Sequence, residues 1–156
     1  MDTDRLDKVL RHINHVKDDC IVLGEKLILA DKEDLGRKLI ANGYIHDNSK
    51  LNGIEWLYLH DEVKDKEPEL FFLAVNQHQQ NNPHHSEYWS DINEMPTLYL
   101  AEMCADWKAR ANEFGTDLRE WIKDKATDKY KFTTKGRVYK DIMYFCNMLL
   151  EPLFKS

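Results

Sequence analysis

The clearest chemical potential in the sequence belongs to His46 and Asp47, which are adjacent, with Lys50 three residues further on. An imidazole and a carboxylate at consecutive positions can both reach one metal ion, but two ligands do not hold it. The chain offers further nitrogen and oxygen ligands in this order: His12, His78, His84, His85 and Asp106. Because Mn, Fe, Co, Ni and Zn accept such ligands, the sequence predicts a site for a divalent transition metal.

The number of ions that this set could hold stays open at one or two. One histidine, the His46-Asp47 pair and a distant aspartate suffice for one divalent ion with open positions for water and substrate. His12 and Asp106 would complete that group. The additional histidines could hold a second ion: His78, His84 and His85.

Helical periodicity separates two neighbouring histidines near the N-terminus. Apolar residues recur from Leu6 to Cys20 at the spacing of one helix face, which predicts a helix from about Thr3 into the low twenties. At about 100° per residue, His12 lies at the edge of the apolar face and His15 points nearly opposite. His12 is therefore favoured as a ligand, with His15 as the alternative.

Helical spacing also places His46 and His78 on buried helix faces. His46 lies seven residues after Leu39, in a helix that Asp34 is predicted to cap. His78 shares the apolar face of a helix whose first turn would contain Pro68. Both imidazoles are expected to point into the protein.

Carboxylates on otherwise apolar helices suggest further members of the site. Glu102 and Asp106 are one turn apart on a helix predicted from about Pro96, and burying them without a cation or a donor between them would be costly. We interpret Asp106 as a ligand and Glu102 as an acceptor that orients a ligand histidine. Glu55 could have the same role, although with Asn52 it has the spacing of a capping box.

The whole pattern predicts an all-α chain that forms a single domain over residues 1–156, because no segment alternates like a strand. The motifs occupy a core of about residues 6–110, and further helices are expected within residues 116–152. The charged stretches 61–67 and 123–135 are expected to be connections, the second of them mobile.

Composition limits the classes of partner. The formal charge of −6 works against sequence-independent binding of long nucleic acid, but a bound cation and local basic side chains can still hold a small phosphorylated substrate. No apolar run approaches the length of a membrane span. Cys20, Cys104 and Cys146 are odd in number and widely spaced, which favours a reducing cytoplasm. Nothing in the sequence indicates the oligomeric state.

The ordered ligand series resembles the HD-domain superfamily of metal-dependent phosphohydrolases. Its signature is a histidine, an adjacent His-Asp pair and a later aspartate on a helical bundle, which are matched here by His12, His46, Asp47 and Asp106. In the dinuclear branch, which includes cyclic-dinucleotide phosphodiesterases, a lysine follows the pair and further histidines precede the last aspartate. Lys50, His78, His84 and His85 are similar to that set. His78 and His84 are closer together than in those enzymes, and their glycine-rich motif is absent after His85.

The closest similarity is to a small uncharacterised family found in bacteria and phages. It covers about residues 6–110 and rests on these stretches: Arg11-His12, His46 to Lys50, Asn81 with His84 to Trp89, and Glu102 to Trp107. The resemblance implies an HD-type helical bundle that hydrolyses a nucleotide or another small phosphate ester or phosphodiester through a metal-activated water.

The resemblance also implies roles for single residues. Lys50 would neutralise charge on the phosphate, and Asp47 or Asp106 would accept the proton of the water. The residues expected to contact the substrate are Lys50, Asn81, Tyr88 and Trp89. Two alternatives stay open: a di-iron oxygenase, since a few HD-fold proteins such as myo-inositol oxygenase use this ligand set, and a non-catalytic module that binds a nucleotide.

Overall fold

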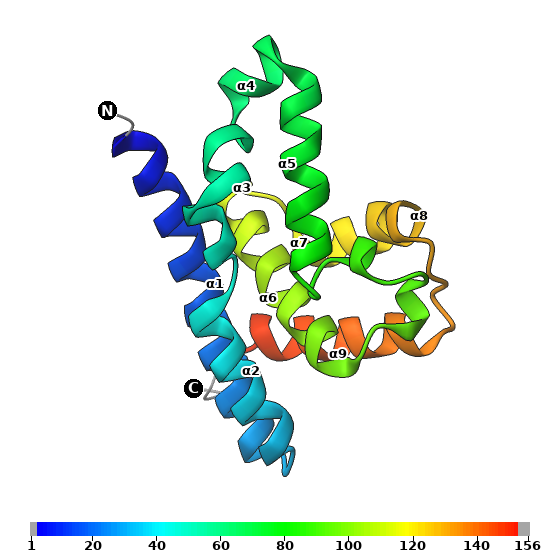
Figure 1. The fold of residues 1–156 in the computed structure, drawn as a ribbon. Helices are drawn as coiled ribbons and strands as arrows, with labels where there is room; N and C mark the ends of the chain where they lie inside the picture. Colours follow the sequence, from blue (N-terminus) through cyan, green and yellow to red (C-terminus); the bar gives the residue numbers. More distant parts are fainter. Residues whose placement is uncertain (1–2, 153–156) are drawn as a thin grey trace.

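The computed structural model describes residues 3–152, and every regular element in that range is a helix, as predicted (Figure 1). The α-helices are α1 (Thr3–Leu29), α2 (Glu33–Ile45), α3 (Gly53–Tyr58), α4 (Asp61–Lys66), α5 (Pro68–Asn81), α6 (Thr97–Phe114), α7 (Leu118–Trp121), α8 (Thr127–Tyr130) and α9 (Arg137–Leu150). Short 3-10 turns lie at Asn48–Leu51, Ser86–Tyr88 and Ile92–Glu94, and a π-helical turn at Ile122–Ala126 joins α7 to α8. None of the helices within residues 3–152 combines the length and apolarity needed to cross a bilayer.

Helices α1 and α2 form a tight antiparallel pair along one side of the molecule (Figure 1). Their backbones approach closely where Gly24 faces Gly36, since a Cβ added to Gly24 would lie 2.7 Å from the carbonyl oxygen of Gly36. A side chain at either position would push the helices apart. The pair therefore fixes the distance between the middle of α1 and the C-terminal end of α2, which both contribute to the site described below.

Helix α6 is the central element and contacts α1, α2 and α9. It is buried on most sides, and small residues such as Ala101, Ala105 and Ala109 allow its neighbours to pack closely. Helix α9 covers it with an apolar face centred on Ile142 and Phe145. Polar groups on α6 therefore lie in the interior and need partners there.

Several predicted boundaries were wrong. Helix α1 extends to Leu29, beyond the low twenties, because Leu23 and Leu27 continue its buried face against the rest of the core. Helix α2 begins at Glu33, and its first turn contains Asp34, which is therefore not the cap. The charged stretch 61–67 is largely helix α4, with acidic residues in its first turn and lysines in its last, an order that suits the helix dipole.

The stretch 123–135 was also predicted wrongly, since much of it is helical. Ala126 is fully buried, and the ring of Tyr130 stacks on Trp107 of α6, with centroids 5.2 Å apart and planes at 23°. These contacts hold the segment against α6 although its sequence is highly charged.

Candidate metal centre

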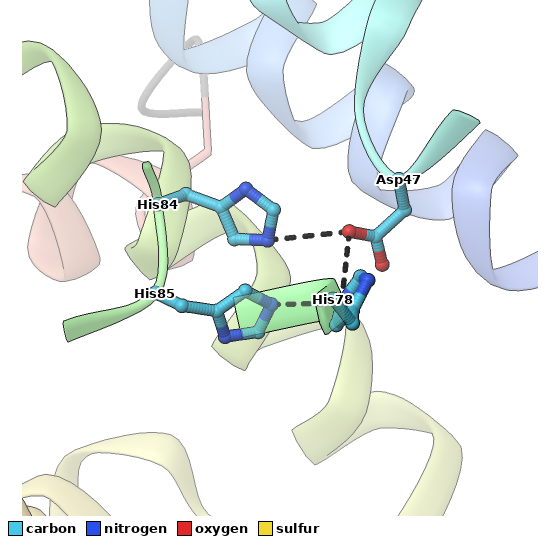
Figure 2. A group of neighbouring side chains, drawn as sticks. All are labelled: Asp47, His78, His84 and His85. Carbon is cyan, nitrogen blue, oxygen red and sulfur yellow. Dashed lines mark hydrogen bonds and ion pairs between the residues drawn. The ribbon is translucent and has the colours of Figure 1, made fainter. Parts of the chain in front are cut away.

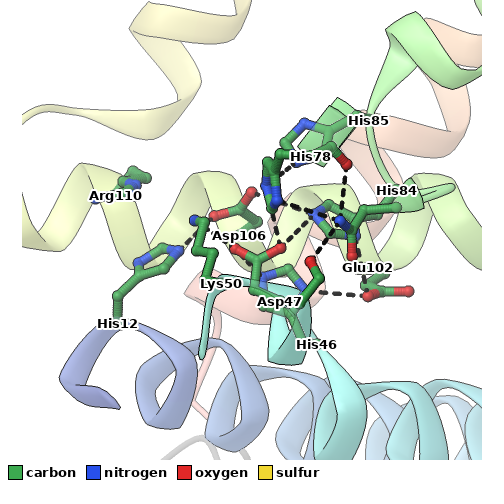
Figure 3. A network of polar contacts seen from close by, with 12 residues as sticks. His12, His46, Asp47, Lys50, His78, His84, His85, Glu102, Asp106 and Arg110 are labelled. Atoms are coloured by element: carbon green, nitrogen blue, oxygen red, sulfur yellow. Dashed lines mark hydrogen bonds and ion pairs between the residues drawn. The ribbon is translucent and has the colours of Figure 1, made fainter. Parts of the chain in front are cut away.

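The predicted ligands come together where α1, the end of α2, α5 and α6 meet (Figure 3). Besides a group of His46, His84 and Glu102, they form two groups whose candidate ligand atoms lie within 4.8 Å of one another. The first group comprises Asp47, His78, His84 and His85, and the second comprises His12, His46 and Asp106. As predicted, His12 is buried, whereas the side chain of His15 is 48% exposed.

A backbone turn at the end of α2 directs two of these side chains inward. The helix ends at Ile45, and Asp47 adopts the left-handed conformation with φ 54°. Aspartate adopts this conformation more readily than most residues. As a result, Ile45 is exposed while the His46 and Asp47 residues are 2% and 1% exposed.

Asp47 joins the two groups. Its Oδ1 atom lies 3.4 Å from Nε2 of His78 and 3.3 Å from Nε2 of His84 (Figure 2). The Nε2 atoms of His78 and His85 are themselves 2.9 Å apart. The other oxygen, Oδ2, lies 3.4 Å from Nε2 of His46 and 2.6 Å from Nζ of Lys50. One carboxylate oxygen therefore faces each group.

Several atoms that face the space between these residues make no hydrogen bond: Oδ1 of Asp47 and Nε2 of His46 and His84. Others have only an ionic partner, since Oδ2 of Asp47 pairs with Lys50 and Oδ1 of Asp106 lies 3.1 Å from Nε2 of His12. Buried polar atoms are rarely left without a partner, and a whole convergent set of them is costly unless something binds there. Imidazole nitrogens and carboxylate oxygens are the donors that a divalent transition metal takes. The groups could thus hold a metal ion.

Glu102 contacts two of the histidines on the side of the imidazole that faces away from the candidate metal centre. Its Oε1 atom lies 3.0 Å from Nδ1 of His46 and 3.3 Å from Nδ1 of His84, and its Oε2 atom accepts a hydrogen bond from Asn42 at 2.9 Å. A carboxylate that accepts a hydrogen bond from Nδ1–H fixes the tautomer in which the Nε2 lone pair is free to bind a metal. Glu102 thus lies where the sequence predicted an acceptor for a ligand histidine.

Glu55 supports His78 in the same way. Its Oε2 atom lies 2.7 Å from Nδ1 of His78 and accepts a hydrogen bond from the Ser49 hydroxyl at 2.9 Å. The interpretation of Glu55 as part of a capping box is wrong, because the Asn52 side chain makes no cap hydrogen bond at the start of α3. Glu55 is instead buried at the centre.

Glu113 was not predicted from the sequence. Its Oε1 atom lies 2.8 Å from Nδ1 of His12, so it supports that histidine as the other two carboxylates support theirs. It is seven residues after Asp106, on the same face of α6, and this spacing could have identified it.

Charge is distributed so that both candidate ligand carboxylates stay ionised. Burial by itself would raise the pKa of the Asp47 carboxyl, but the Lys50 ammonium and His46 hold that pKa well below its usual range. Burial likewise opposes ionisation of Asp106, but its interactions with His12, His46 and His84 together outweigh burial and hold its pKa well below the usual range. Two anionic carboxylates therefore face the centre at neutral pH.

The two adjacent histidines of the loop after α5 differ in charge. Burial lowers the pKa of His84, but its interactions with Asp47 and Glu102 outweigh burial and raise the pKa to about 10. Burial and then repulsion from His84 and His78 lower the pKa of His85 to about 3. At neutral pH His85 is a neutral imidazole, whereas His84 must lose a proton before it can bind a metal.

Comparison with known proteins gives one assignment. The family described as "Family of unknown function (DUF5662)" matches residues 1–148, nearly the whole chain. The chain belongs to the DUF5662 family. No curated protein and no solved structure gives a significant match.

Two cavities open beside the centre of this DUF5662 chain. One has a volume of about 330 Å³, and we call it the basic cleft because Arg5, Lys50 and Arg110 line it together with His85 and Asp106. The other, of about 350 Å³, is the aromatic cavity, lined by Trp107, Trp121 and Tyr130. The two cavities share His85, Asp106 and Arg110.

Of the four residues predicted to contact the substrate, one lies at these cavities. Lys50 lines the basic cleft, but none of the other three lines either cavity. Asn81 is exposed, and its neighbour Asn82 donates instead to the Ser49 hydroxyl at 3.1 Å. Tyr88 is also exposed, and the Trp89 indole donates to a backbone carbonyl of its own loop. Arg110, one turn after Asp106, was missed.

Proposed function

We propose that this protein is a metal-dependent phosphohydrolase of HD type that acts on a small phosphate ester, nucleotides included. The observation that carries the proposal is the convergence of buried imidazole and carboxylate atoms, several of them without a hydrogen bond, on a space that adjoins a cleft with basic side chains. The order of these ligands along the chain also resembles the superfamily signature.

The chain offers donors for one ion or two. His12, His46 and Asp106 would hold one together with Asp47, whose Oδ2 atom lies 3.4 Å from Nε2 of His46. His78, His84 and His85 would hold a second ion that shares Asp47. When bound, Mn, Fe, Co, Ni or Zn supplies a Lewis acid and a water acidic enough to act as a nucleophile near neutral pH.

Lys50 and Arg110 provide the positive charge that a phosphate needs. The Lys50 ammonium lies against Asp47 and faces the basic cleft, where it can neutralise charge that develops on the phosphoryl oxygens. The Arg110 guanidinium can bind two phosphate oxygens at once because of its planar fork of donors. Its side chain is 47% exposed, so an anion entering from solvent can reach it.

Asp47 and Asp106 are the bases of the centre. Both are held in the ionised form, so either can accept a proton from the attacking water. Carboxylates on Glu102, Glu55 and Glu113 keep the ligand imidazoles oriented, so the chain places its donors before a substrate arrives.

The test combines metal analysis with a substrate panel. Protein purified without chelator is analysed for metal content and assayed on phosphomonoesters, nucleotides and phosphodiesters. We expect hydrolysis that is lost in His46→Ala with Asp47→Ala and kept in His15→Ala, the matched control on the exposed side of α1. The proposal fails if the loaded protein hydrolyses nothing in the panel or if the double variant stays active. Two irons per chain with a mixed-valence signal would support the oxygenase instead, and a nucleotide retained unchanged would support the binding module.

A further inference from the structure

The aromatic cavity lies between α6 and the segment that follows it. Its walls come from the C-terminal half of α6, from α7 and from α8, and its inner end reaches the metal centre. The residues that line it include His85, Asp106, Trp107, Arg110, Trp121 and Tyr130. At about 350 Å³ it has the size of a pocket for a small organic ligand.

Three aromatic rings form one wall of this cavity. Trp107 and Tyr130 are nearly parallel, whereas Trp121 meets Trp107 edge to face, with centroids 5.0 Å apart and planes at 75°. Trp107 is buried, but Trp121 and Tyr130 are only half-buried. Aromatic residues that serve the core alone, such as Phe145, are closed off from solvent at 2% exposure. The cavity therefore offers ring surface that the protein itself does not cover.

Cations lie beside these rings. The Lys129 ammonium is 4.9 Å from the centroid of the Tyr130 ring, and Arg110 lines both the aromatic cavity and the basic cleft. At the inner end, His85 and Asp106 also belong to both cavities. A ligand that extends from the metal centre into the aromatic cavity would meet a charged end and an apolar, flat end.

We propose that the aromatic cavity binds a flat, aromatic part of the substrate while the phosphate lies at the metal centre between Lys50 and Arg110. Stacking on aromatic faces favours a planar ring over an aliphatic group of equal size. The identity of the anionic end rests on the proposed function, but the aromatic character of the other end rests on the cavity alone. Residues 116–130 thereby supply part of the substrate site.

The test uses phosphonates, whose carbon–phosphorus bond the proposed hydrolysis does not cleave. Binding of benzylphosphonate, cyclohexylmethylphosphonate and methylphosphonate to the metal-loaded protein is measured by calorimetry. Benzyl and cyclohexylmethyl have the same number of carbon atoms, but only benzyl is flat. We expect benzylphosphonate to bind about tenfold more tightly than methylphosphonate and more tightly than cyclohexylmethylphosphonate.

Variants assign this preference to the wall of the cavity. Trp121→Leu and Tyr130→Leu should each remove most of the benzyl preference and leave the affinity for methylphosphonate unchanged. Tyr139→Leu is the matched control, because Tyr139 is a half-buried tyrosine on α9 that does not line the cavity. If either cavity variant does not fold, the affinities of the three phosphonates for the unchanged protein still test whether the site prefers a flat ring.

The inference is overturned if cyclohexylmethylphosphonate binds as tightly as benzylphosphonate, if no phosphonate binds, or if the folded cavity variants keep the benzyl preference. Its failure is distinguishable from failure of the proposed function. If the protein prefers benzylphosphonate but hydrolyses no ester, the inference about the aromatic cavity is supported and the proposed phosphohydrolase function is refuted. If it hydrolyses an ester but shows no preference for benzylphosphonate, the proposed function is supported and the inference about the cavity is refuted.

Discussion

Glu102 is the side chain whose removal should affect the centre most without removing a ligand that the sequence predicts. It contacts Nδ1 of His46 and Nδ1 of His84, one histidine from each group, and it is 4% exposed. Glu102→Gln keeps the size of the side chain but removes its charge. The amide has one acceptor oxygen instead of two and carries no negative charge, so it accepts weaker hydrogen bonds and the imidazoles lose part of their orientation and basicity.

The expected effect follows from the number of histidines held. Loss of one such carboxylate commonly weakens metal binding about 10- to 100-fold, which is about 1.4–2.7 kcal/mol. Because Glu102 serves two imidazoles, we expect a loss near the upper end of that range. Glu113→Gln, which affects one ligand histidine, His12, should lie nearer the lower end.

The assay is a competitive titration of metal-free protein with Zn²⁺ or Mn²⁺ and an indicator chelator, with metal content as a second measurement. Glu33→Gln is the matched control, since Glu33 is an exposed carboxylate at the start of α2 that pairs with Arg37. If Glu102→Gln folds and binds the metal within twofold of the unchanged protein, the assignment of Glu102 as the support of the ligand histidines is refuted.

Three further predictions concern charge, protons and packing. Lys50→Ala should lower kcat/KM for a hydrolysed phosphate ester about hundredfold while metal content stays the same, because Lys50 stabilises charge and is no ligand; unchanged kinetics would contradict this. Metal binding at pH 7 should release about one proton per chain, because the pKa of about 10 keeps His84 protonated until a metal displaces the proton. Apparent metal affinity should therefore rise with pH. Calorimetry in buffers of different ionisation enthalpy measures the number of protons released, and a binding enthalpy that does not depend on the buffer would contradict this prediction. Gly36→Ala should lower the free energy of unfolding by about 1–3 kcal/mol, because its Cβ would collide with the carbonyl oxygen of Gly24; thermal melting that matches the unchanged protein would contradict this.

Helical phase was enough to predict that the histidines placed on helices, His12, His46 and His78, face the centre. The 100° step per residue separates His12 from His15, and the structure buries the first and exposes the second. The phase argument for His46 also gave the correct direction, although the helix ends one residue earlier. The left-handed turn at Asp47 could not be predicted from periodicity, because a single-residue change of backbone conformation leaves no repeat in the sequence.

Long-range contacts explain what the sequence did not indicate. Asn52 and Glu55 have the spacing of a capping box, but Glu55 is bound by His78 from another helix, and this tertiary contact prevails over the local pattern. The charged stretch around Tyr130 packs because of its contact with Trp107, a residue far away in the sequence. The two cavities beside the centre were not predicted for the same reason, since their walls are assembled from separate helices.

The candidate ligands come from four separate parts of the chain, between His12 and Asp106. An ion held by all of them would act as a removable cross-link between the N-terminal hairpin, α5 and the central helix. Because it would bind the folded chain and hardly the unfolded one, each tenfold increase of free ion above Kd would add about 1.4 kcal/mol to the free energy of unfolding. The supply of metal would then set how long the protein survives proteolysis as well as whether it can react.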